Sequence, residues 1–393
     1  ESRGLGDVYK RQINDSCQSV LPALLPLFIY TYGLSLEQAG FLILANTALS
    51  SLLQPLLGYI SDKLNQPRLI AAGTLLSACS TGMMGFVSSY ESLLICATLA
   101  GVGSSIFHPE GAKIMNRLGG GKKGKAMGTF AIGGSSGFAF GPLFAGAIAY
   151  TVGAHGLAAF TVAGIIISTV LFLLMPRIVA HAQTIDQAVA TENPTVAAQP
   201  LKNYWKYFGI LFIIILSQSV NFRVINAFIP VFWTHELGTS PEQGSFALTV
   251  FFSIGIFMTY IGGLLGDKYG PIKIIRLSLL IWLPSMFLLT QVPEFSVTIM
   301  MPLAYLILLM IGAAKAISYS PVIVLGQTYL AKSIGFASGI TLGVSQTIGG
   351  IIAPVVGNLA DTYSLPAAMM TLVPFLIVGL VASLLLKDPK KLQ

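Results

Sequence analysis

Residues 156–176 read GLAAFTVAGIIISTVLFLLMP and contain no charged side chain. A helix of roughly 20 residues crosses the hydrocarbon core of a bilayer, which is about 30 Å thick, so this run is long enough to span it. The run shows none of the period-2 alternation that a strand of an outer-membrane barrel requires. We therefore predict a transmembrane helix over this segment.

The whole chain repeats this signal, and with 156–176 it gives twelve such segments in two sets of six. The first set lies at 13–33, 37–60, 68–88, 92–116, 124–150 and 156–176, and the second at 204–233, 242–266, 271–291, 295–326, 333–360 and 364–386. Overall, 54% of the residues are apolar and 9% are charged, whereas a soluble domain is about 25% charged. This composition excludes a disordered chain, a coiled coil and an ordinary soluble enzyme. We predict an all-α polytopic membrane protein with twelve transmembrane helices in two six-helix halves.

The predicted organisation divides the chain into five parts, namely 1–12, 13–176, 177–203, 204–386 and 387–393. The second and fourth parts are the six-helix halves, and the last part is a cytoplasmic tail. The third part is polar, rich in Ala, Thr and Gln, and contains two prolines, which indicates a cytoplasmic linker. The first part, ESRGLGDVYKRQ, is polar and runs directly into an apolar stretch. We expect it to be a non-native leftover that replaces apolar native sequence.

The formal net charge of +7 comes from Lys and Arg residues concentrated at the loops on one side of the membrane. In a soluble domain such a charge would suggest nucleic acid as a partner. Here the Lys and Arg residues beyond position 12 lie in the loops after every second span or close beside them, with two exceptions deep inside spans, Arg223 and Lys315. The opposite loops contain acidic residues but no Lys or Arg. This distribution follows the positive-inside rule and predicts that both termini are cytoplasmic.

The two halves carry the same short pattern at the same place. Gly58 precedes Asp62-Lys63 after the second span, and Gly263 precedes Asp267-Lys268 after the eighth, with the same spacing. Two related six-span halves joined by a polar linker are the plan of a secondary transporter.

These Gly-x-x-x-Asp-Lys loops resemble the signature of the major facilitator superfamily between its second and third spans, and its echo between the eighth and ninth. In the first copy, Asn65 and Gln66 depart from the pattern. The fifth span resembles the antiporter signature of the same superfamily through Gly128, Gly137, Gly141, Pro142 and Gly146. Small residues also let ordinary membrane helices approach closely, so general helix packing is an alternative explanation of these glycines.

A narrower resemblance is to the fosmidomycin-resistance exporter family. It rests mainly on the first half, on Asn14-Asp15 with Gln18-Ser19, Gln54-Pro55, Gly58-Tyr59, Gly101-Val-Gly103-Ser-Ser and Phe107-His108-Pro109-Glu110. The resemblance implies a transporter of the bacterial inner membrane that functions as a monomer, with a central cavity lined by spans 1, 4, 7 and 10. It also implies that Asp62 and Asp267 act as cytoplasmic latches on the N-terminal ends of spans 11 and 5.

Five charged or titratable side chains stand out as candidates within predicted spans, and all five fall on spans 1, 4, 7 or 10: Asp15, His108, Glu110, Arg223 and Lys315. A charge at the bilayer centre is costly, so such residues usually face a cavity and have a function. Carboxylates and histidine can bind and release a proton, so we assign proton coupling to the three residues of the first half. Arg and Lys suit an oxyanion. We assign substrate binding to Arg223 and Lys315, with Gln18 and Asn226 as hydrogen-bonding neighbours.

The three residues assigned to proton coupling also have structural alternatives. Glu110 could pair with Lys113 at i+3 near the membrane surface. Asp15 could cap or pair at a helix end, and His108 could be a packed, hydrogen-bonded histidine. Pro109 could bend the helix so that the residues before and after it reach one cavity.

The combined prediction is a proton-coupled antiporter that exports a small anionic drug such as fosmidomycin. Its partners are protons, the anion and the bilayer. We expect no nucleic acid, ATPase subunit, cofactor or metal site, and no enzymatic activity. Two alternatives stay open: an importer or exchanger of another organic anion, such as a sugar phosphate or carboxylate, and a non-transporting membrane receptor.

Overall fold

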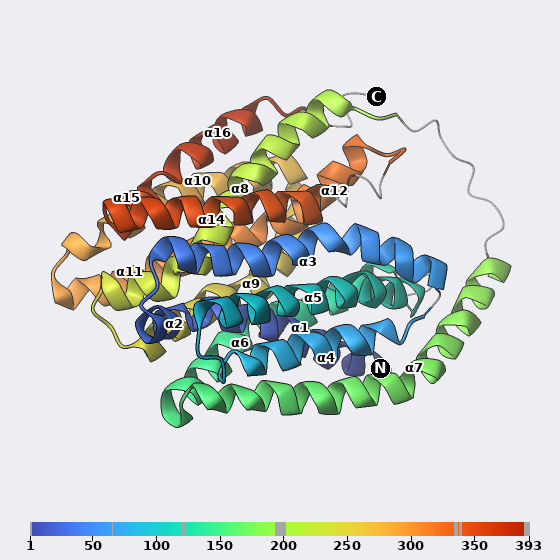
Figure 1. Cartoon of the computed structure of the whole chain (residues 1–393). Helices are drawn as coiled ribbons and strands as arrows, with labels where there is room; N and C mark the ends of the chain where they lie inside the picture. The colour runs from blue at the N-terminus through green and yellow to red at the C-terminus, as the bar shows by residue number, and fades with distance from the viewer. Residues whose placement is uncertain are drawn as a thin grey trace. The chain divides into compact units, whose positions relative to one another are not determined.

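The computed structural model describes residues 2–64, 66–118, 123–192, 202–333, 337 and 340–388. Within these ranges the regular structure is helical, apart from one isolated bridge between Asn203 and Leu330 (Figure 1). Eight helices of the described part are long and apolar enough to cross a membrane.

The helices follow the two predicted sets of spans. The first set comprises α1 (Ser2–Ala23), α2 (Leu25–Tyr32), α3 (Leu36–Leu64), α4 (Leu69–Met83), α5 (Tyr90–Leu118), α6 (Lys123–Val152), η2 (Ala154–Leu157) and α7 (Ala158–Glu192). The second comprises α8 (Trp205–His235), α9 (Pro241–Tyr269), α10 (Pro271–Gln291), η3 (Val292–Glu294), α11 (Val297–Ile317), α12 (Tyr319–Tyr329), η4 (Ile340–Val344), α14 (Ser345–Thr362), α15 (Leu365–Met370) and α16 (Val373–Leu384).

Several predicted spans consist of two helices separated by a short break. Span 1 is α1 and α2, interrupted at Leu24, and span 10 is α11 and α12, interrupted at Ser318. A proline follows each break, Pro26 and Pro321, and proline has no N–H to continue the helical hydrogen bonds. When such pairs are joined, the described helices give the twelve predicted spans, and the predicted all-α fold class is confirmed.

The helix α7 is longer than the sixth predicted span. It continues to Glu192, through residues that we predicted to belong to the linker. The added segment, RIVAHAQTIDQAVATE, contains neither Gly nor Pro and is rich in Ala and Gln, which favour helix. The helix ends just before Pro194, where the proline ring disfavours helical backbone.

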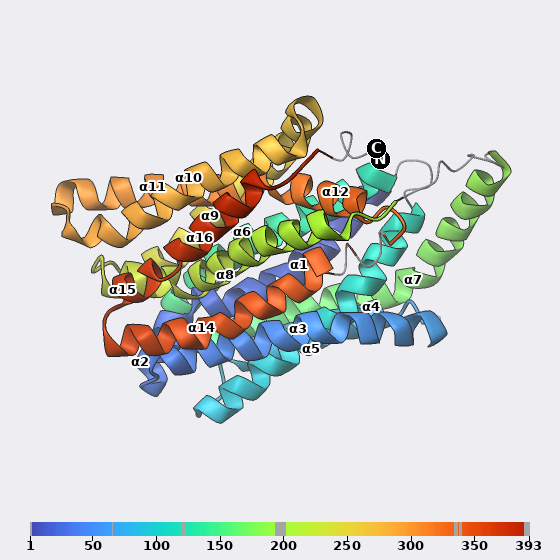
Figure 2. The ribbon, with the colours of Figure 1, turned by 90° about the horizontal axis from the view of Figure 1, so that it is seen from above.

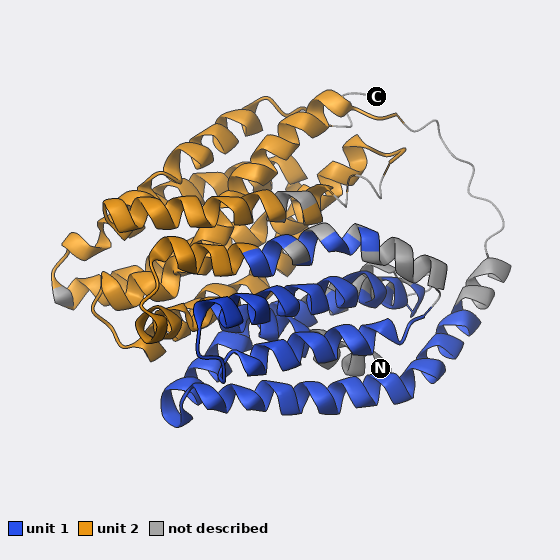
Figure 3. Cartoon of the chain, viewed as in Figure 1, with its two compact units in different colours: residues 1–21, 45–199 blue, residues 22–44, 200–393 orange. Residues whose placement is uncertain are grey.

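The chain divides into two compact units, and the division differs from the two halves of the sequence. The first unit comprises residues 1–21 and 45–199, and the second comprises 22–44 and 200–393 (Figure 3). Residues 22–44 therefore pack with the second unit, where α2 contacts α8 and α9.

Close backbone approach shapes the packing within each unit. In the first unit α4 packs against α5 and α7. A Cβ on Gly73 of α4 would lie 2.7 Å from the carbonyl oxygen of Gly103 on α5, so only glycine allows this approach. In the second unit α10 and α11 run side by side (Figure 2), and α8 packs against α14 and α16.

Candidate functional site

The first unit brings two predicted proton-coupling residues into contact. Asp15 lies on α1 and His108 on α5, and His108 Nε2 lies 3.3 Å from Asp15 Oδ1. The Asp15 side chain is fully buried, whereas the His108 side chain is 24% exposed. A buried carboxylate needs hydrogen bonds or a proton to offset its loss of hydration. The imidazole and the carboxylate therefore lie close enough to share a proton.

Two further buried side chains complete a small polar cluster around this pair. Asn14 Nδ2 donates to Asp15 Oδ1 at 3.1 Å and lies 3.5 Å from Ser104 Oγ. His108 Nδ1 lies 2.9 Å from the carbonyl oxygen of Ser104 and 3.1 Å from its hydroxyl. We did not assign Asn14 or Ser104 a role from the sequence. The sequence contained one indication of the Ser104 contact: Ser104 lies four residues before His108, and residues four apart lie on one face of a helix.

Glu110 lies beside Lys113, the pairing that we gave as the structural alternative to a role in proton coupling. Its side chain is 4% exposed, and its Oε1 lies 4.0 Å from Lys113 Nζ, one helical turn further along α5. The helix α5 is continuous through Pro109, from Tyr90 to Leu118. The structure thus places His108 against Asp15 and Glu110 against Lys113.

The glycines of the antiporter-like pattern pack α6 against the helix that carries Asp15. A Cβ on Gly137 would lie 2.9 Å from the backbone N of Ser16, and one on Gly141 would lie 2.8 Å from the Ser16 carbonyl oxygen. Ser16 Oγ also donates to the Gly137 carbonyl oxygen at 3.2 Å. Gly137 and Gly141 therefore hold α1 close to α6. Pro142 and Gly146 lie further along α6. Gly128 is also in α6, but its surroundings lie outside the description.

The second unit contains the predicted cation pair. Lys315 Nζ lies 4.9 Å from the ring centre of Phe222, and Arg223 Cζ lies 5.8 Å from the same ring centre. Lys315 Nζ also lies 5.1 Å from the ring centre of Tyr319, at the start of α12. The two cations thus share one aromatic ring. Among the described residues, no carboxylate lies within ion-pair distance of either cation.

Unpaired polar atoms lie on the same helix as Arg223. Arg223 Nε, Gln218 Nε2 and Asn226 Oδ1 are buried and have no hydrogen-bond partner in the described structure. The Arg223 stem passes Gly349 of α14, where an added Cβ would lie 3.0 Å from Arg223 Cγ. Buried polar groups are normally hydrogen-bonded, so these unpaired atoms indicate a place where a polar ligand could bind.

The four residues assigned to substrate binding are divided between the units. Arg223, Lys315 and Asn226 belong to the second unit, whereas Gln18 belongs to the first. The Gln18 amide Nε2 donates to the Ala100 carbonyl oxygen of α5 at 3.1 Å. Its amide N–H is therefore used within the first unit, between α1 and α5.

The two Gly-x-x-x-Asp-Lys patterns lie at the C-terminal ends of two helices. Gly58, Asp62 and Lys63 lie in the last turns of α3, and their surroundings lie outside the description. Gly263, Asp267 and Lys268 lie in the last turns of α9, which stops at Gly270 with a positive φ of 92°. Asp267 and Lys268 are exposed.

At the opposite end of the spans, the second unit contains contacts that we did not predict. Asp361, in the last turn of α14, accepts hydrogen bonds from the backbone N–H groups of Leu36 at 2.8 Å and Glu37 at 2.9 Å. Asn358 Nδ2 donates to Glu37 Oε2 at 2.9 Å. A Cβ on Gly40 would lie 2.6 Å from Pro354 Cα. The start of α3 is thus capped by a carboxylate from α14, and the two helices approach closely.

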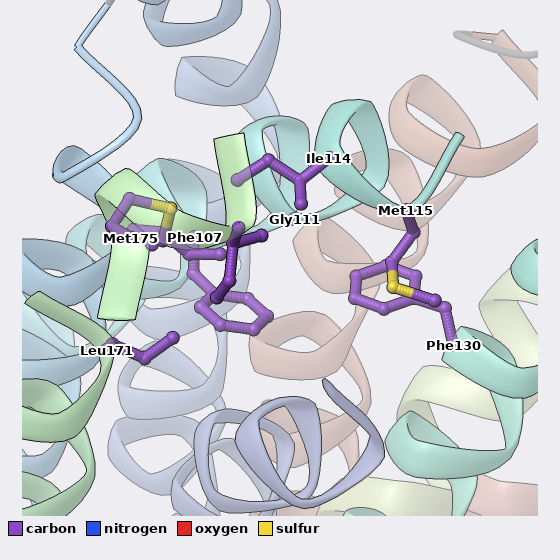
Figure 4. A pocket seen from close by; sticks show the side chains of 9 residues that line it. Phe107, Gly111, Ile114, Met115, Phe130, Leu171 and Met175 are labelled. Atoms are coloured by element: carbon purple, nitrogen blue, oxygen red, sulfur yellow. The ribbon is translucent and has the colours of Figure 1, made fainter. Parts of the chain in front are cut away.

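A small cavity lies beside His108 but is lined by apolar side chains. The cavity has a volume of about 20 Å³. Figure 4 shows Phe107, Met115, Phe130, Leu171 and Met175 among the side chains that line it. The rings of Phe107 and His108 meet edge to face at 5.7 Å. The side chains that line the cavity are apolar, and the Phe107 ring among them contacts the His108 ring.

Comparisons with known proteins agree with this architecture. The family model described as Major Facilitator Superfamily matches residues 13–217 and again 207–393. The chain is 30% identical to the Fosmidomycin resistance protein of Escherichia coli (strain K12), over 90% of this chain and 85% of that protein. It is 29% identical to the uncharacterised MFS-type transporter YfnC of Bacillus subtilis (strain 168), over 96% and 91% of the two chains.

Solved structures share the fold at low sequence identity. A bacterial homologue of the human lysosomal transporter Spinster, in an inward-facing and occupied conformation, has a TM-score of 0.76 and 17% identity, with 98% of this chain and 96% of that chain covered. A D-xylose–proton symporter has a TM-score of 0.75 and 16% identity, with 98% and 97% covered. With two six-span halves, repeated Gly-x-x-x-Asp-Lys patterns and a matching family model across the chain, this protein belongs to the major facilitator superfamily of membrane transporters.

Proposed function

We propose that this transporter is a proton-coupled antiporter that exports a small anionic compound, of which a phosphonate such as fosmidomycin is the model. One observation carries the proposal. The first unit contains the Asp15–His108 pair, which can bind a proton, and the second unit contains the Arg223–Lys315 pair, for which the described residues supply no counter-ion. The likeness to the Fosmidomycin resistance protein supports the substrate class.

The second unit has the chemistry of an oxyanion site. The guanidinium of Arg223 can offer two parallel N–H groups to a phosphonate or carboxylate, and the ammonium of Lys315 adds a compact charge. Arg223 Cζ and Lys315 Nζ both lie over the Phe222 ring, whose negative face attracts cations. The buried acceptor Asn226 Oδ1 can receive a hydroxyl or N–H of the substrate.

The first unit supplies the exchangeable proton. Asp15 and His108 hold it, and Glu110, paired with Lys113, is a second buried acid two residues after His108 on α5. Export against a gradient follows if the protein releases substrate only after it has taken up a proton from the outer side. The coupling requires only that the proton and the anion favour different conformations.

The contacts of Asp361 form the outer gate in this scheme. Its carboxylate stabilises the positive N-terminal end of α3 and satisfies two backbone N–H groups there. Opening of this end requires these bonds and the Gly40–Pro354 approach to separate. Asp62 and Asp267 act as the corresponding latches at the cytoplasmic end. Both termini and the connection between α7 and α8 lie in the cytoplasm, and the protein works as a monomer in the bacterial inner membrane.

The test of this proposal is substrate-induced proton movement in proteoliposomes. Fosmidomycin, a sugar phosphate, a dicarboxylate and a cationic drug are each added while internal pH and substrate flux are followed. We expect the phosphonate to move protons in the direction opposite to its own flux. Parallel movement of proton and anion would indicate an importer, and binding without flux would indicate a receptor.

A further inference from the structure

We infer that a hollow beside α7 binds one anionic phospholipid, with the side chain of Arg68 on the lipid phosphate. The hollow has a volume of about 280 Å³ and lies between α7 and the loop that precedes α4. Its polar lining comes from Gln66, Arg68 and Gln183, and its apolar lining includes Met175, Pro176 and Val179. All these residues belong to the first unit, and none of them belongs to the proposed proton or anion site.

The hollow lies where α7 leaves the apolar part of its sequence. Residues 156–176 carry no charge, and only 28% of the most apolar 18-residue stretch of this helix is buried within the protein. Most of that stretch therefore faces lipid. From Arg177 onward the helix is polar, and Arg177 itself is exposed. The hollow is thus at the level where the hydrocarbon core of the bilayer meets the headgroups.

Arg68 supplies the positive charge at this level. Its side chain is exposed, and its Cζ lies 4.8 Å from the ring centre of Phe172 on α7. The Phe172 ring is 48% exposed, so the guanidinium rests at the edge of the lipid-facing surface. Contact with a ring face consumes none of the N–H donors of a guanidinium, which can therefore bind phosphate oxygens. The side chains of Lys63 and Asp186 lie outside the description, and the charge of the site is assigned to Arg68.

A phospholipid matches the groups that this region offers. Its phosphate meets Arg68, and the hydroxyls of a glycerol headgroup can bond to the amides of Gln66 and Gln183. Its acyl chains can follow the exposed apolar side chains of α7, which include Ile166, Val170, Phe172 and Leu173. Basic pockets beside membrane helices on the cytoplasmic side bind anionic headgroups, and the positive-inside distribution of Lys and Arg assigns the hollow to that side.

Lipid titration followed by native mass spectrometry tests the site without measuring transport. The full chain in detergent is titrated with phosphatidylglycerol, and Arg68→Gln is compared with Arg276→Gln. Arg276, in the second unit, is a control because it donates to the carbonyl oxygens of Ser383 at 2.9 Å and Leu384 at 3.4 Å. We expect Arg68→Gln to weaken binding of the first lipid about fivefold, the effect of one basic side chain near an anionic membrane surface. An equal loss in both variants would overturn the role of Arg68.

Two further compounds distinguish the whole lipid from its headgroup charge and from a free anion. Phosphatidylcholine has acyl chains but no net charge, and it should bind more weakly than phosphatidylglycerol. Inorganic phosphate has no acyl chains and should not displace phosphatidylglycerol even in large excess. Equal binding of the two lipids, or displacement by phosphate, would overturn the assignment to an anionic lipid.

Filling the hollow tests its location while Arg68 keeps its charge. Ala180 is exposed and lines the hollow, so Ala180→Trp should occupy the space. His181→Trp is the matched control, because His181 is the next residue of α7, is exposed and is not among the residues that line the hollow. We expect only Ala180→Trp to weaken phosphatidylglycerol binding, by at least as much as Arg68→Gln. If both Trp variants bind the lipid as the unaltered protein does, the lipid does not occupy this hollow.

Discussion

Replacement of Asp361 by Asn tests the outer gate in the most direct way. The carboxylate accepts hydrogen bonds from two successive backbone N–H groups at the start of α3, at 2.8 and 2.9 Å. Asn has the same shape but no charge, and its NH₂ group cannot accept the second bond. The variant therefore removes one acceptor and the favourable interaction of a negative charge with the N-terminal end of the helix dipole.

The size of the effect follows from these two losses. Loss of a helix cap costs about 1 kcal/mol, and loss of a charge beside an exposed helix end costs roughly 0.3–1 kcal/mol. Together they destabilise the closed outer end by about 1–2 kcal/mol, which changes a two-state equilibrium by a factor of about 5–30. The start of α3 should therefore spend much more time separated from α14.

Accessibility of a cysteine measures this change. Ala39 is fully buried on α3, one turn after the capped end. We place Ala39→Cys in a protein whose three native cysteines are replaced, and follow its modification by a membrane-impermeant thiol reagent added from the outside. Asp361→Asn should raise the rate about 5- to 30-fold.

The control variant is Ser364→Ala. Ser364 caps α15 through its hydroxyl, which accepts from the Ala367 backbone N–H at 3.3 Å, and this cap is local to one helix. The control should change the modification rate little. If Asp361→Asn and Ser364→Ala give the same rate, or if the Asp361 variant lowers it, then the carboxylate does not hold the gate closed.

Two further predictions concern packing around the two sites. Gly141→Val places two methyl groups against the Ser16 and Ser19 region of α1. Such overpacking should cost about 1–3 kcal/mol of stability and displace Asp15. Thermal unfolding in detergent measures the loss, and Gly343→Val is the control, because an added Cβ on Gly343 has no neighbouring atom within 4 Å. Phe222→Leu keeps an apolar side chain but removes the ring near both cations. It should weaken anion binding by about 1 kcal/mol, or roughly fivefold. Calorimetric titration with the phosphonate measures the affinity, and an unchanged affinity would show that the ring only fills space.

The sequence determines the spans because hydropathy acts locally. An uncharged run such as 156–176 can satisfy its backbone only as a helix in lipid, so its structure does not depend on its neighbours. The boundary at residue 176 was less predictable. Polarity suggested a linker there, but good helix formers continue α7 to Glu192. The assignment of residues 22–44 to the second unit depends on long-range packing and has no local signal.

The candidate sites also combine features that follow from local sequence with features that depend on long-range packing. The cost of a buried charge singled out Asp15, His108, Arg223 and Lys315 without any structure. The partners that give these residues their chemistry include a carbonyl of Ser104 and the ring of Phe222. A backbone carbonyl has no sequence signature, and phenylalanine is too common in membrane helices to indicate a site. Asp361 was visible only as an acidic residue near a span end, because its bonds join segments that are far apart in the sequence.

The division of labour between the two units is tested most directly by comparing two flux measurements on the same variants. Counterflow exchange reports substrate binding and conformational change, and flux driven by a pH gradient reports proton coupling as well. We predict that Asp15→Asn and Glu110→Gln lose gradient-driven export but keep exchange, and that Arg223→Ala and Lys315→Ala lose both, with substrate affinity weakened by about 2–5 kcal/mol. If the two pairs of variants lose both activities equally, the proton and the anion do not occupy separate sites.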